Sequence, residues 1–418
     1  MKAMKRGSGA AGLRGGSRDH WHGITAPPPH RPAVPQIVLI VVAMLSSSIA
    51  LAQDPGLEPP ATESSQTEYT TTAIGGGAYL DLAYALSNNR PGNHGWRSKA
   101  TTLFVDKLVL NNGTVFLGKR PSRASPWGFK AGVQLGKDVD NLSTTGSGTA
   151  DLLKHLHYTY ATYLAPVGGQ ELALVGGLIP GHLGYESFQA INNPTYTRVY
   201  GVDNVPYFQW GLAAQYPYGG KVSGVVMVTS GWDYLSSPNN APSYGGRVHW
   251  DVNDAAWLRG NVFYGPEQEN TSLEFWRLAV EGIGQVRIGD FELIGNFGYG
   301  AERQATVIGS PRYQWSWGAL WVNWRPGGGP WSAGLRPEFF RDEDRLITSS
   351  RQTITAVTAA LRYQVTVGRQ VLQLRTEYRF DRSTGPDGGF WQGTNNMLVP
   401  NQQLFMLAVN WRFDTSYR

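Results

Sequence analysis

Apolar and polar residues alternate with a period of two along most of the chain after residue 74, in blocks of about ten residues. The alternation is clearest in blocks 127–136, 371–381 and 403–413. In block 371–381, Arg375, Glu377, Arg379 and Asp381 alternate with Leu, Thr, Tyr and Phe residues. A strand with this pattern has one polar face and one apolar face, so the chain is predicted to be all-β.

Turn residues divide the alternating blocks into separate strands. Asn112-Gly113 is also typical of a hairpin turn, and a turn there would add a strand, so the sequence allows 14 to 18 strands. We predict sixteen strands, near 75–86, 100–110, 127–136, 155–165, 171–179, 207–216, 222–229, 243–250, 256–264, 275–288, 291–299, 313–324, 331–341, 353–366, 371–380 and 403–413.

The connections between these strands alternate in length. Short turns fall at 166–169, 217–220, 251–254, 289–290, 325–330 and 368–369. Long polar connections fall at 137–154, 180–206, 230–242, 265–274, 300–312, 342–352 and 381–402. A soluble β-sandwich shares the two-faced strands but has no reason to alternate its loop lengths. We therefore predict a transmembrane antiparallel up-and-down β-barrel over residues 74–413, with both termini in the periplasm and a C-terminal extension at 414–418.

The N-terminal region has the features of a secretory signal peptide. A basic segment precedes the apolar run Ile37–Leu45, and Ala50-Leu51-Ala52 ends it with small residues. A membrane-anchoring helix is the alternative, but the run is well short of the ~20 residues that span a bilayer. We predict that residues 1–52 are cleaved after Ala52 and that the polar segment 53–73 is a disordered periplasmic tail. The location this implies is the outer membrane of a Gram-negative bacterium.

Charge and composition narrow the possible partners. The chain of 418 residues has no cysteine, which excludes disulfides and thiolate metal sites. Its formal charge of +5 comes from the first 52 residues, because the remainder holds 30 basic and 30 acidic residues. A nucleic-acid partner therefore loses its main support.

The membrane environment determines which strand face points where. A charged side chain facing lipid would cost up to ~2–4 kcal/mol, depending on its depth in the bilayer. The polar faces must therefore line the lumen, and the predicted pore-lining residues are Arg375, Glu377, Arg379, Asp381, Arg336, Glu338, Lys130 and Gln134. The long connection 180–206, which holds Glu186 and Arg198, is a candidate constriction loop.

Aromatic residues and the last strand point to outer-membrane lipid and the assembly machinery as partners. Many aromatic side chains fall near strand ends, where an amphipathic ring suits the headgroup boundary. These include Trp127, Tyr216, Trp250, Tyr264, Tyr299, Trp315 and Trp411. The alternating aromatics that end in Phe413 resemble the C-terminal signal through which the barrel-assembly machinery recognises outer-membrane proteins.

From about Gly77 to Phe413 the chain resembles the OmpL-like family of β-barrel porins. The most specific carriers are Arg336, Glu338, Phe339 and Asp342, and the run Leu374–Ser383. The others are 127–129, 160–166, 184–186 with Asn193, Tyr196 and Arg198, 231–233 and 264–268. Pro337 stands where the family pattern has Tyr, which leaves a bulge or register change open there. The resemblance implies a porin, an aqueous channel for passive diffusion of small polar solutes or ions.

Other kinds of function have less support in the sequence than a porin. We find no spacing that brings His, Ser and an orienting residue together, so no catalytic residue, cofactor or metal site is predicted and the chain is not expected to be an enzyme. His155 and His157 share a strand face but lack a third ligand. A surface adhesin or structural barrel is the main alternative, and an outer-membrane hydrolase comes third. A homo-oligomer is compatible with the sequence, which marks no subunit interface.

Overall fold

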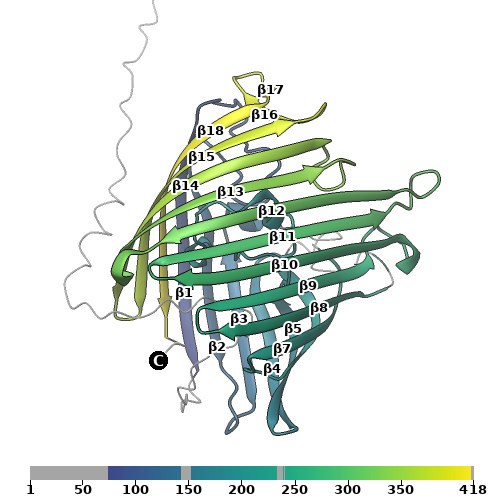
Figure 1. Ribbon diagram of the computed structural model, residues 1–418, viewed down its shortest axis with the longest axis vertical. Coiled ribbons are helices and arrows are strands. Elements are labelled where there is room, and N and C mark those ends of the chain that lie inside the picture. The colour runs from purple at the N-terminus through teal and green to yellow at the C-terminus, as the bar shows by residue number, and fades with distance from the viewer. Residues whose placement is uncertain (1–73, 143–151, 233–238, 240, 416–418) are drawn as a thin grey trace, which may run out of the picture. The chain divides into compact units, whose positions relative to one another are not determined.

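The computed structural model describes residues 74–142, 152–232, 239 and 241–415. The predicted signal peptide and tail, together with residues 416–418 of the predicted extension, lie outside these ranges. Sixteen strands form a closed antiparallel barrel (Figure 1): β1 (Gly75–Ser87), β2 (Leu108–Lys119), β3 (Trp127–Leu135), β4 (Leu156–Val167), β5 (Gln170–Pro180), β6 (Phe208–Tyr216), β7 (Val222–Thr229), β8 (Ser243–Asn253), β9 (Ala256–Pro266), β10 (Trp276–Ile288), β11 (Phe291–Arg303), β12 (Arg312–Trp324), β13 (Trp331–Asp342), β14 (Gln352–Val367), β15 (Gln370–Thr384) and β18 (Asn401–Asp414).

The remaining elements are short and lie in the connections. A two-stranded hairpin, β16 (Phe390–Gln392) and β17 (Met397–Val399), precedes the last barrel strand. The helices are α2 (Lys137–Asp140), α4 (Tyr200–Asp203) and the 3-10 turns η1 (Ala190–Asn192), η2 (Leu273–Phe275) and η3 (Pro326–Gly328). Within the described ranges, no helix has the length and apolar character needed to cross a membrane.

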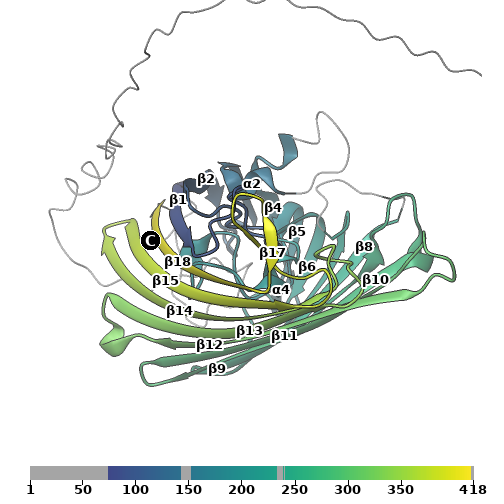
Figure 2. The same ribbon diagram turned by 90° about the horizontal axis from the view of Figure 1, so that it is seen from above.

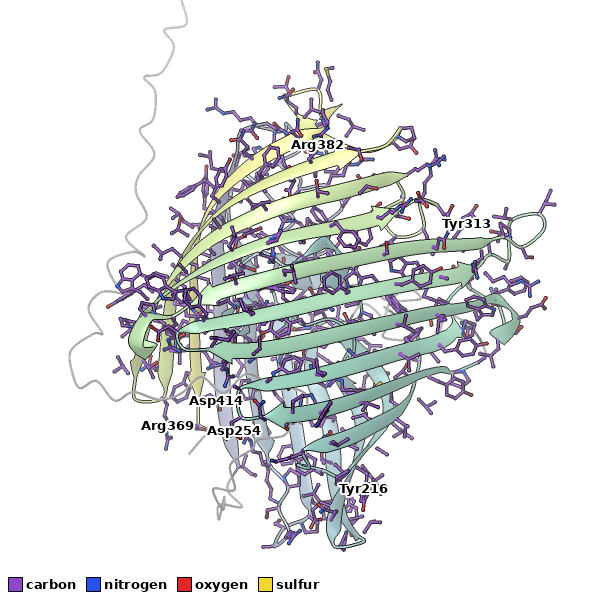
Figure 3. All side chains as sticks on the ribbon, in the orientation of Figure 1. Tyr216, Asp254, Tyr313, Arg369, Arg382 and Asp414 are labelled. Atoms are coloured by element: carbon purple, nitrogen blue, oxygen red, sulfur yellow. The ribbon has the colours of Figure 1, made fainter. Side chains whose placement is uncertain are left out.

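Each strand pairs with its neighbours in sequence, and β18 closes the ring by pairing with β1. The predicted count of sixteen strands and the up-and-down order are confirmed. Figure 3 shows Asp254, Arg369 and Asp414, from two short turns and the end of β18, toward one end of the barrel. Arg382 and Tyr313 lie toward the other end, where the long connections emerge. The closed ring leaves no strand edge unpaired, as a sheet in lipid requires.

The two faces of the sheet differ as the alternation predicts. On β15, Leu374 and Tyr378 are each 46% exposed, whereas Arg375 is 5% and Arg379 is 1% exposed. The same contrast recurs around the ring, with an outer surface of Leu, Val, Phe and Tyr side chains and an inner surface of polar ones. This distribution is the reverse of a water-soluble sandwich and is stable only where lipid surrounds the barrel.

The strand predicted at 100–110 is wrong, because the second strand runs from Leu108 to Lys119. Its register against β1 shifts between Asp81 and Leu82, which pair with Asn112 and Leu110 and leave Asn111 as an extra residue. Asn112-Gly113 therefore lies beside a β-bulge inside a strand and does not form a hairpin.

Two further details of strand geometry differ from expectation. Pro337 causes no register change, since the pairs Ala319–Glu338 and Val322–Leu335 keep one register and only the pairs between them are missing. Most of the predicted boundary aromatics are exposed on the outer surface, for example Trp127 at 62%. Trp315 is the exception, because it points inward and is 2% exposed.

Candidate functional site

The connection between β5 and β6, residues 181–207, is called the inward segment because it crosses the barrel interior. Near its start, the Gly184 amide donates to Glu281 of β10 over 2.8 Å. Further along, the Tyr196 hydroxyl donates to Asp81 of β1, also over 2.8 Å. Because β1 and β10 lie on different sides of the ring, the segment spans the lumen between them, and Figure 2 shows α4 within the ring of strands.

The predicted lumen charges on β15 bind this segment directly. Glu377 accepts the Tyr196 amide over 2.8 Å and the hydroxyl of Thr197. Arg375 donates to the carbonyl oxygen of Asn193 over 3.0 Å. Glu377 is 2% exposed, so this part of the inner wall is covered. These contacts stabilise one position of the segment, since a buried carboxylate without its donors would be costly.

Arg336 of β13 forms the second anchor. Its guanidinium lies 2.9 Å from a carboxylate oxygen of Glu186 and also donates to the Thr195 hydroxyl and the Thr197 carbonyl. Glu186 in turn accepts the Val199 amide over 2.7 Å. Burial raises the pKa of Glu186, and the nearby Arg336 opposes that rise. Arg336 thus holds residues from before and after η1, Glu186 and Thr195, to β13.

Glu338, Arg379 and Asp381 complete the group of predicted lumen charges on β13 and β15, which we call the charge ladder. Glu338 accepts the Tyr200 amide over 3.0 Å and forms an ion pair with Arg379. Arg379 also donates to Asp381 over 2.7 Å, and its guanidinium lies 5.0 Å from the centre of the Tyr200 ring. All six charges predicted on β13 and β15 therefore meet around the inward segment.

The other predicted residues are placed differently. Lys130 of β3 is half-buried, with its ammonium 4.5 Å from the centre of the Phe116 ring. Gln134 is 3% exposed and donates to the carbonyl oxygens of Lys154 and Leu156. Arg198, at the centre of the inward segment, is fully buried, with a nitrogen 3.9 Å from the Asp138 carboxylate. Its guanidinium also donates to the carbonyl oxygens of Ser187 and Phe188, so Arg198 stabilises the segment from within and links it to α2.

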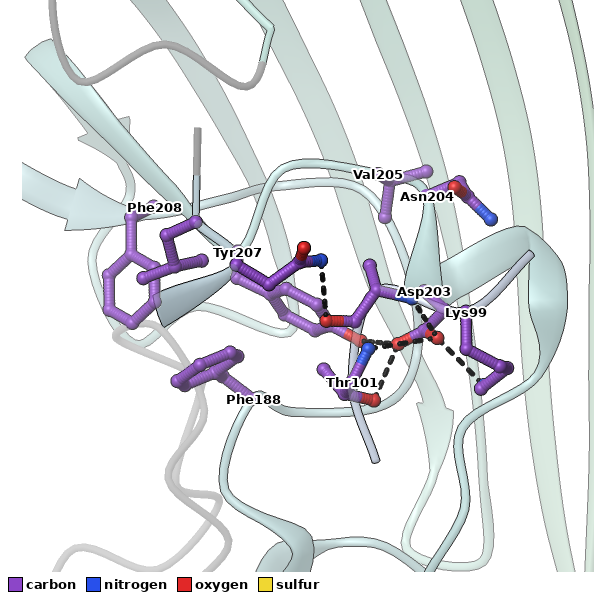
Figure 4. Close-up of a pocket in the computed structure, with 11 residues that line it drawn as sticks. Lys99, Thr101, Phe188, Asp203, Asn204, Val205, Tyr207 and Phe208 are labelled. Carbon is purple, nitrogen blue, oxygen red and sulfur yellow. Dashed lines mark hydrogen bonds and ion pairs between the residues drawn. The ribbon is translucent and has the colours of Figure 1, made fainter. Parts of the chain in front are cut away.

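A buried ion pair joins the inward segment to the first long connection, residues 88–107. Asp203 lies 2.7 Å from the Lys99 ammonium and accepts the Thr101 hydroxyl over 2.6 Å, as Figure 4 shows. Burial alone would raise the pKa of Asp203, but Lys99 and the hydrogen bonds from Thr101 and Ala100 lower it. A pocket of about 260 Å³ borders this pair and Tyr207. Lys99 and Thr101 at the pocket wall bind Asp203, so they hold the inward segment to the connection 88–107.

The opposite side of the inward segment packs on an aromatic surface. Trp315, Trp317 and Trp321 of β12 point inward and are at most 2% exposed. A Cβ atom on Gly298 of β11 would lie only 2.0 Å from a ring carbon of Trp317, so the indole lies flat against the sheet there. Glycine is thus required next to the tryptophan, and the flat ring leaves room for α4.

Gly201 in α4 provides a single-residue test of this packing. A Cβ atom there would lie 2.2 Å from Cγ of Trp317, an atom close to the sheet that cannot move freely. We expect Gly201→Ala to destabilise the packed segment by about 1–3 kcal/mol, measured as a lower urea midpoint. Gly282→Ala is the matched control, because nothing lies within 4 Å of that Cβ position. Equal midpoints for the two variants would contradict the packing.

The described residues offer no metal centre, since no group of three His, Asp or Glu side chains is arranged to hold an ion. His157 is buried with Nδ1 3.2 Å from the Gln134 side-chain oxygen, and His155 lies 3.1 Å from the Gln134 carbonyl. Both histidines therefore belong to the junction of β3 and β4.

Several residues of the site were missed from the sequence. Lys99 and Asp203 are far apart in the chain, and no local pattern joins them. Arg362 could have been predicted to face the barrel interior, because it shares a strand face with Ile354 and Thr358 in the predicted strand 353–366. Its side chain is half-buried and donates to the Ser332 hydroxyl over 2.9 Å.

Solved structures of outer-membrane proteins are similar to this chain. An anion-selective porin from Comamonas acidovorans matches 82% of this chain and 99% of its own, with 10% identity and a TM-score of 0.51. The channel DcaP of Acinetobacter baumannii matches 82% and 96%, with 12% identity and a TM-score of 0.49. OmpT of Vibrio cholerae matches 82% and 99%, with 10% identity and a TM-score of 0.47. At 10% identity, the likeness to the Comamonas porin shows the fold alone.

No curated protein matches the sequence. The family model described as "Putative beta-barrel porin-2, OmpL-like" matches residues 73–413, which includes every barrel strand except the last residue of β18, Asp414. The match covers the charge ladder, the inward segment and the closing strand together. The chain belongs to the OmpL-like family of β-barrel porins.

Proposed function

We propose that this outer-membrane porin conducts small polar solutes by passive diffusion, and that the inward segment sets the width of the passage. The supporting observation is that buried ion pairs and hydrogen bonds hold residues 181–207 against β13 and β15. A segment held at many points narrows the lumen by a constant amount, as a selective diffusion channel requires.

The passage follows the inner wall that the inward segment leaves uncovered. On each of the four consecutive strands β4 to β7, one inward-facing side chain is half-buried, namely Tyr160, Val175, Ala213 and Val225. Inward neighbours such as Leu164, Ala173 and Gln215 are buried. On β1, β13 and β15 the corresponding side chains Asp81, Arg336 and Glu377 are buried. The proposed solute path therefore lies beside β4–β7.

Shortening the inward segment tests this proposal. A short Gly-Ser linker in place of residues 186–199 removes the contacts of the inward segment with Arg336, Arg375 and Glu377 and should widen the lumen. Arg379 keeps its ion pairs with Glu338 and Asp381. We expect larger single-channel conductance steps in planar bilayers. Shortening the connection 305–309 between β11 and β12 is the control and should leave the steps unchanged. Equal conductance of the inward-segment variant and the wild type would refute the proposed constriction.

A barrel with a closed lumen, used for surface attachment, is the second candidate. The close packing of α4 on the buried tryptophans of β12 favours it, because it occupies part of the lumen on that side. This candidate predicts a wild type without conductance and a shortened variant that conducts. The two functions are therefore distinguished by the wild-type recording.

Export and assembly follow from the two ends of the chain. We propose that residues 1–52 direct export and are removed after Ala52. The closing strand β18 has an outer face with Phe405 at 47% and Leu407 at 53% exposure, which supports recognition by the barrel-assembly machinery and contact with lipid. Homo-oligomerisation remains part of the proposal, tested by the mass of the detergent-solubilised protein.

A further inference from the structure

The charged side chains on the outward face of the barrel strands are all basic. Strand alternation places on this face Lys119 of β2, Arg303 of β11, Arg312 of β12, Arg341 of β13 and Arg382 of β15. Every acidic residue within the sixteen described barrel strands occupies an inward position, as Glu338 and Asp381 do. Because a charge in hydrocarbon is costly, the outward basic residues belong at the edges of the lipid-covered band.

The four outward arginines lie at the extracellular ends of their strands. Arg303 is the last residue of β11, and Arg312 is the first residue of β12. Arg341 is next to last in β13, and Arg382 lies two residues before the end of β15. Figure 3 shows Arg382 toward the end of the barrel from which the long connections emerge. Lys119 lies at the opposite end, in β2. Positive charge on the outer surface is therefore concentrated at its extracellular edge.

Three arginines lie close together at this edge, and we call Arg341, Arg351 and Arg382 the arginine cluster. Arg341 pairs with Thr353 of β14, which in turn pairs with Thr384 of β15. Arg351 and Arg382 each lie two residues along the chain from one of these threonines. Because neighbouring strands are about 4.8 Å apart, the backbones of the three arginines lie within about 15 Å of one another. Their long side chains can therefore reach one ligand.

The guanidinium groups of the cluster are accessible. Arg351 and Arg382 are exposed, and within the described ranges neither side chain forms an ion pair or a hydrogen bond. Arg341 forms an ion pair with Glu343 in which the two side chains are 55% and 41% exposed. An exposed ion pair of this kind contributes little to stability and exchanges readily. The cluster therefore has donors for an incoming anion.

Two further acids in the adjacent connections already have partners. Asp344 accepts the Gln314 amide over 2.9 Å. Asp387 lies 2.6 Å from the Arg345 guanidinium. An anion that binds the cluster therefore does not have to displace either carboxylate from an arginine of the cluster.

The outer surface directly below the cluster is apolar and aromatic. Phe339, two residues before Arg341, is 38% exposed, and Tyr378, four residues before Arg382, is 46% exposed. Aromatic rings at this position mark the boundary between hydrocarbon and headgroups. Arginine side chains just beyond that boundary place their apolar stems along the surface and their charge among the headgroups. The ligand that this position favours is therefore a lipid headgroup.

We propose that the arginine cluster binds the phosphate groups of a phosphorylated lipid in the outer leaflet of the outer membrane. A guanidinium donates two parallel hydrogen bonds to a phosphate, and such charge-assisted bonds are among the strong ones in proteins. Basic side chains at the membrane surface attract anionic headgroups about fivefold per residue. The inference concerns the lipid around the barrel and goes beyond the proposed channel function.

Native mass spectrometry of the protein refolded in a neutral detergent measures this binding, with diphosphoryl and monophosphoryl lipid A as probes. We expect the wild type to bind the diphosphoryl form at least about fivefold more tightly than the monophosphoryl form. The variant Arg341→Gln, Arg351→Gln, Arg382→Gln should bind diphosphoryl lipid A about 100-fold more weakly than the wild type. The matched control, Lys221→Gln, Arg287→Gln, Arg369→Gln, removes the same charge from exposed residues near the periplasmic ends and should keep the wild-type affinity.

Three results would overturn the inference. The first is equal affinity of the wild type for the two forms of lipid A, which needs no variant. The second is wild-type affinity in the arginine-cluster variant, or an equal loss in the control variant, which would show attraction by overall charge. The third is displacement of bound lipid A by inorganic phosphate, which would show a site for free phosphate. Each of these results leaves the diffusion channel standing, because the measurement does not involve conductance.

Discussion

Arg336→Met is expected to lower the free energy of unfolding by about 3–5 kcal/mol, because it removes one partner from a buried ion pair. Glu186 and Glu338 lie 2.9 and 3.6 Å from the Arg336 guanidinium, and the arginine side chain is fully buried. Without the Arg336 cation, the buried carboxylates of Glu186 and Glu338 each lose a positively charged partner. Urea unfolding of the protein refolded in detergent, followed by tryptophan fluorescence, measures the loss.

Two further variants make the Arg336 result specific. Arg382→Met removes an exposed arginine and should change stability by less than about 0.5 kcal/mol. The double variant Arg336→Met, Glu186→Gln should recover part of the loss, since the charge that was left unpaired is also removed. Wild-type stability in Arg336→Met would show that the inward segment is not anchored at β13.

Leu374→Arg is the second variant with a large expected effect, about 2–4 kcal/mol if the side chain lies near the middle of the bilayer. Leu374 is 46% exposed on the outer face of β15, between the buried Gln373 and Arg375. On a water-soluble protein the same exposed substitution would cost little. Folding into lipid vesicles, compared by urea titration with the apolar control Leu374→Phe, gives the difference. Equal stability of the two variants would contradict a lipid-facing surface.

Alternation predicted the fold well because it is a local property that lipid enforces residue by residue. Placing Leu374 outside and Arg375 inside needs only the period of the strand and the cost of a charge in hydrocarbon. The prediction failed at 100–110, where Lys99 and Thr101 serve a loop that binds Asp203 about a hundred residues away. A pattern within ten residues carries no information about such a partner.

The sequence predicted which charged residues of β13 and β15 face the barrel interior, but it did not predict that they bind the inward segment. The ladder from Arg375 to Asp381 was expected to face solutes, yet its side chains hold the inward segment and are at most 5% exposed. Which loop folds inward depends on its contacts with several strands at once, including the flat tryptophans that Gly298 and Gly300 accommodate. Arg362, by contrast, shares a strand face with Ile354 and Thr358, so the alternation could have identified it.

Single-channel recording of the purified, refolded wild type in a planar bilayer tests the central claim most directly. We expect stable open steps whose current rises linearly with voltage, because the proposed passage stays open beside the inward segment. A protein that folds into the bilayer as a heat-stable barrel but shows no steps would contradict a diffusion channel.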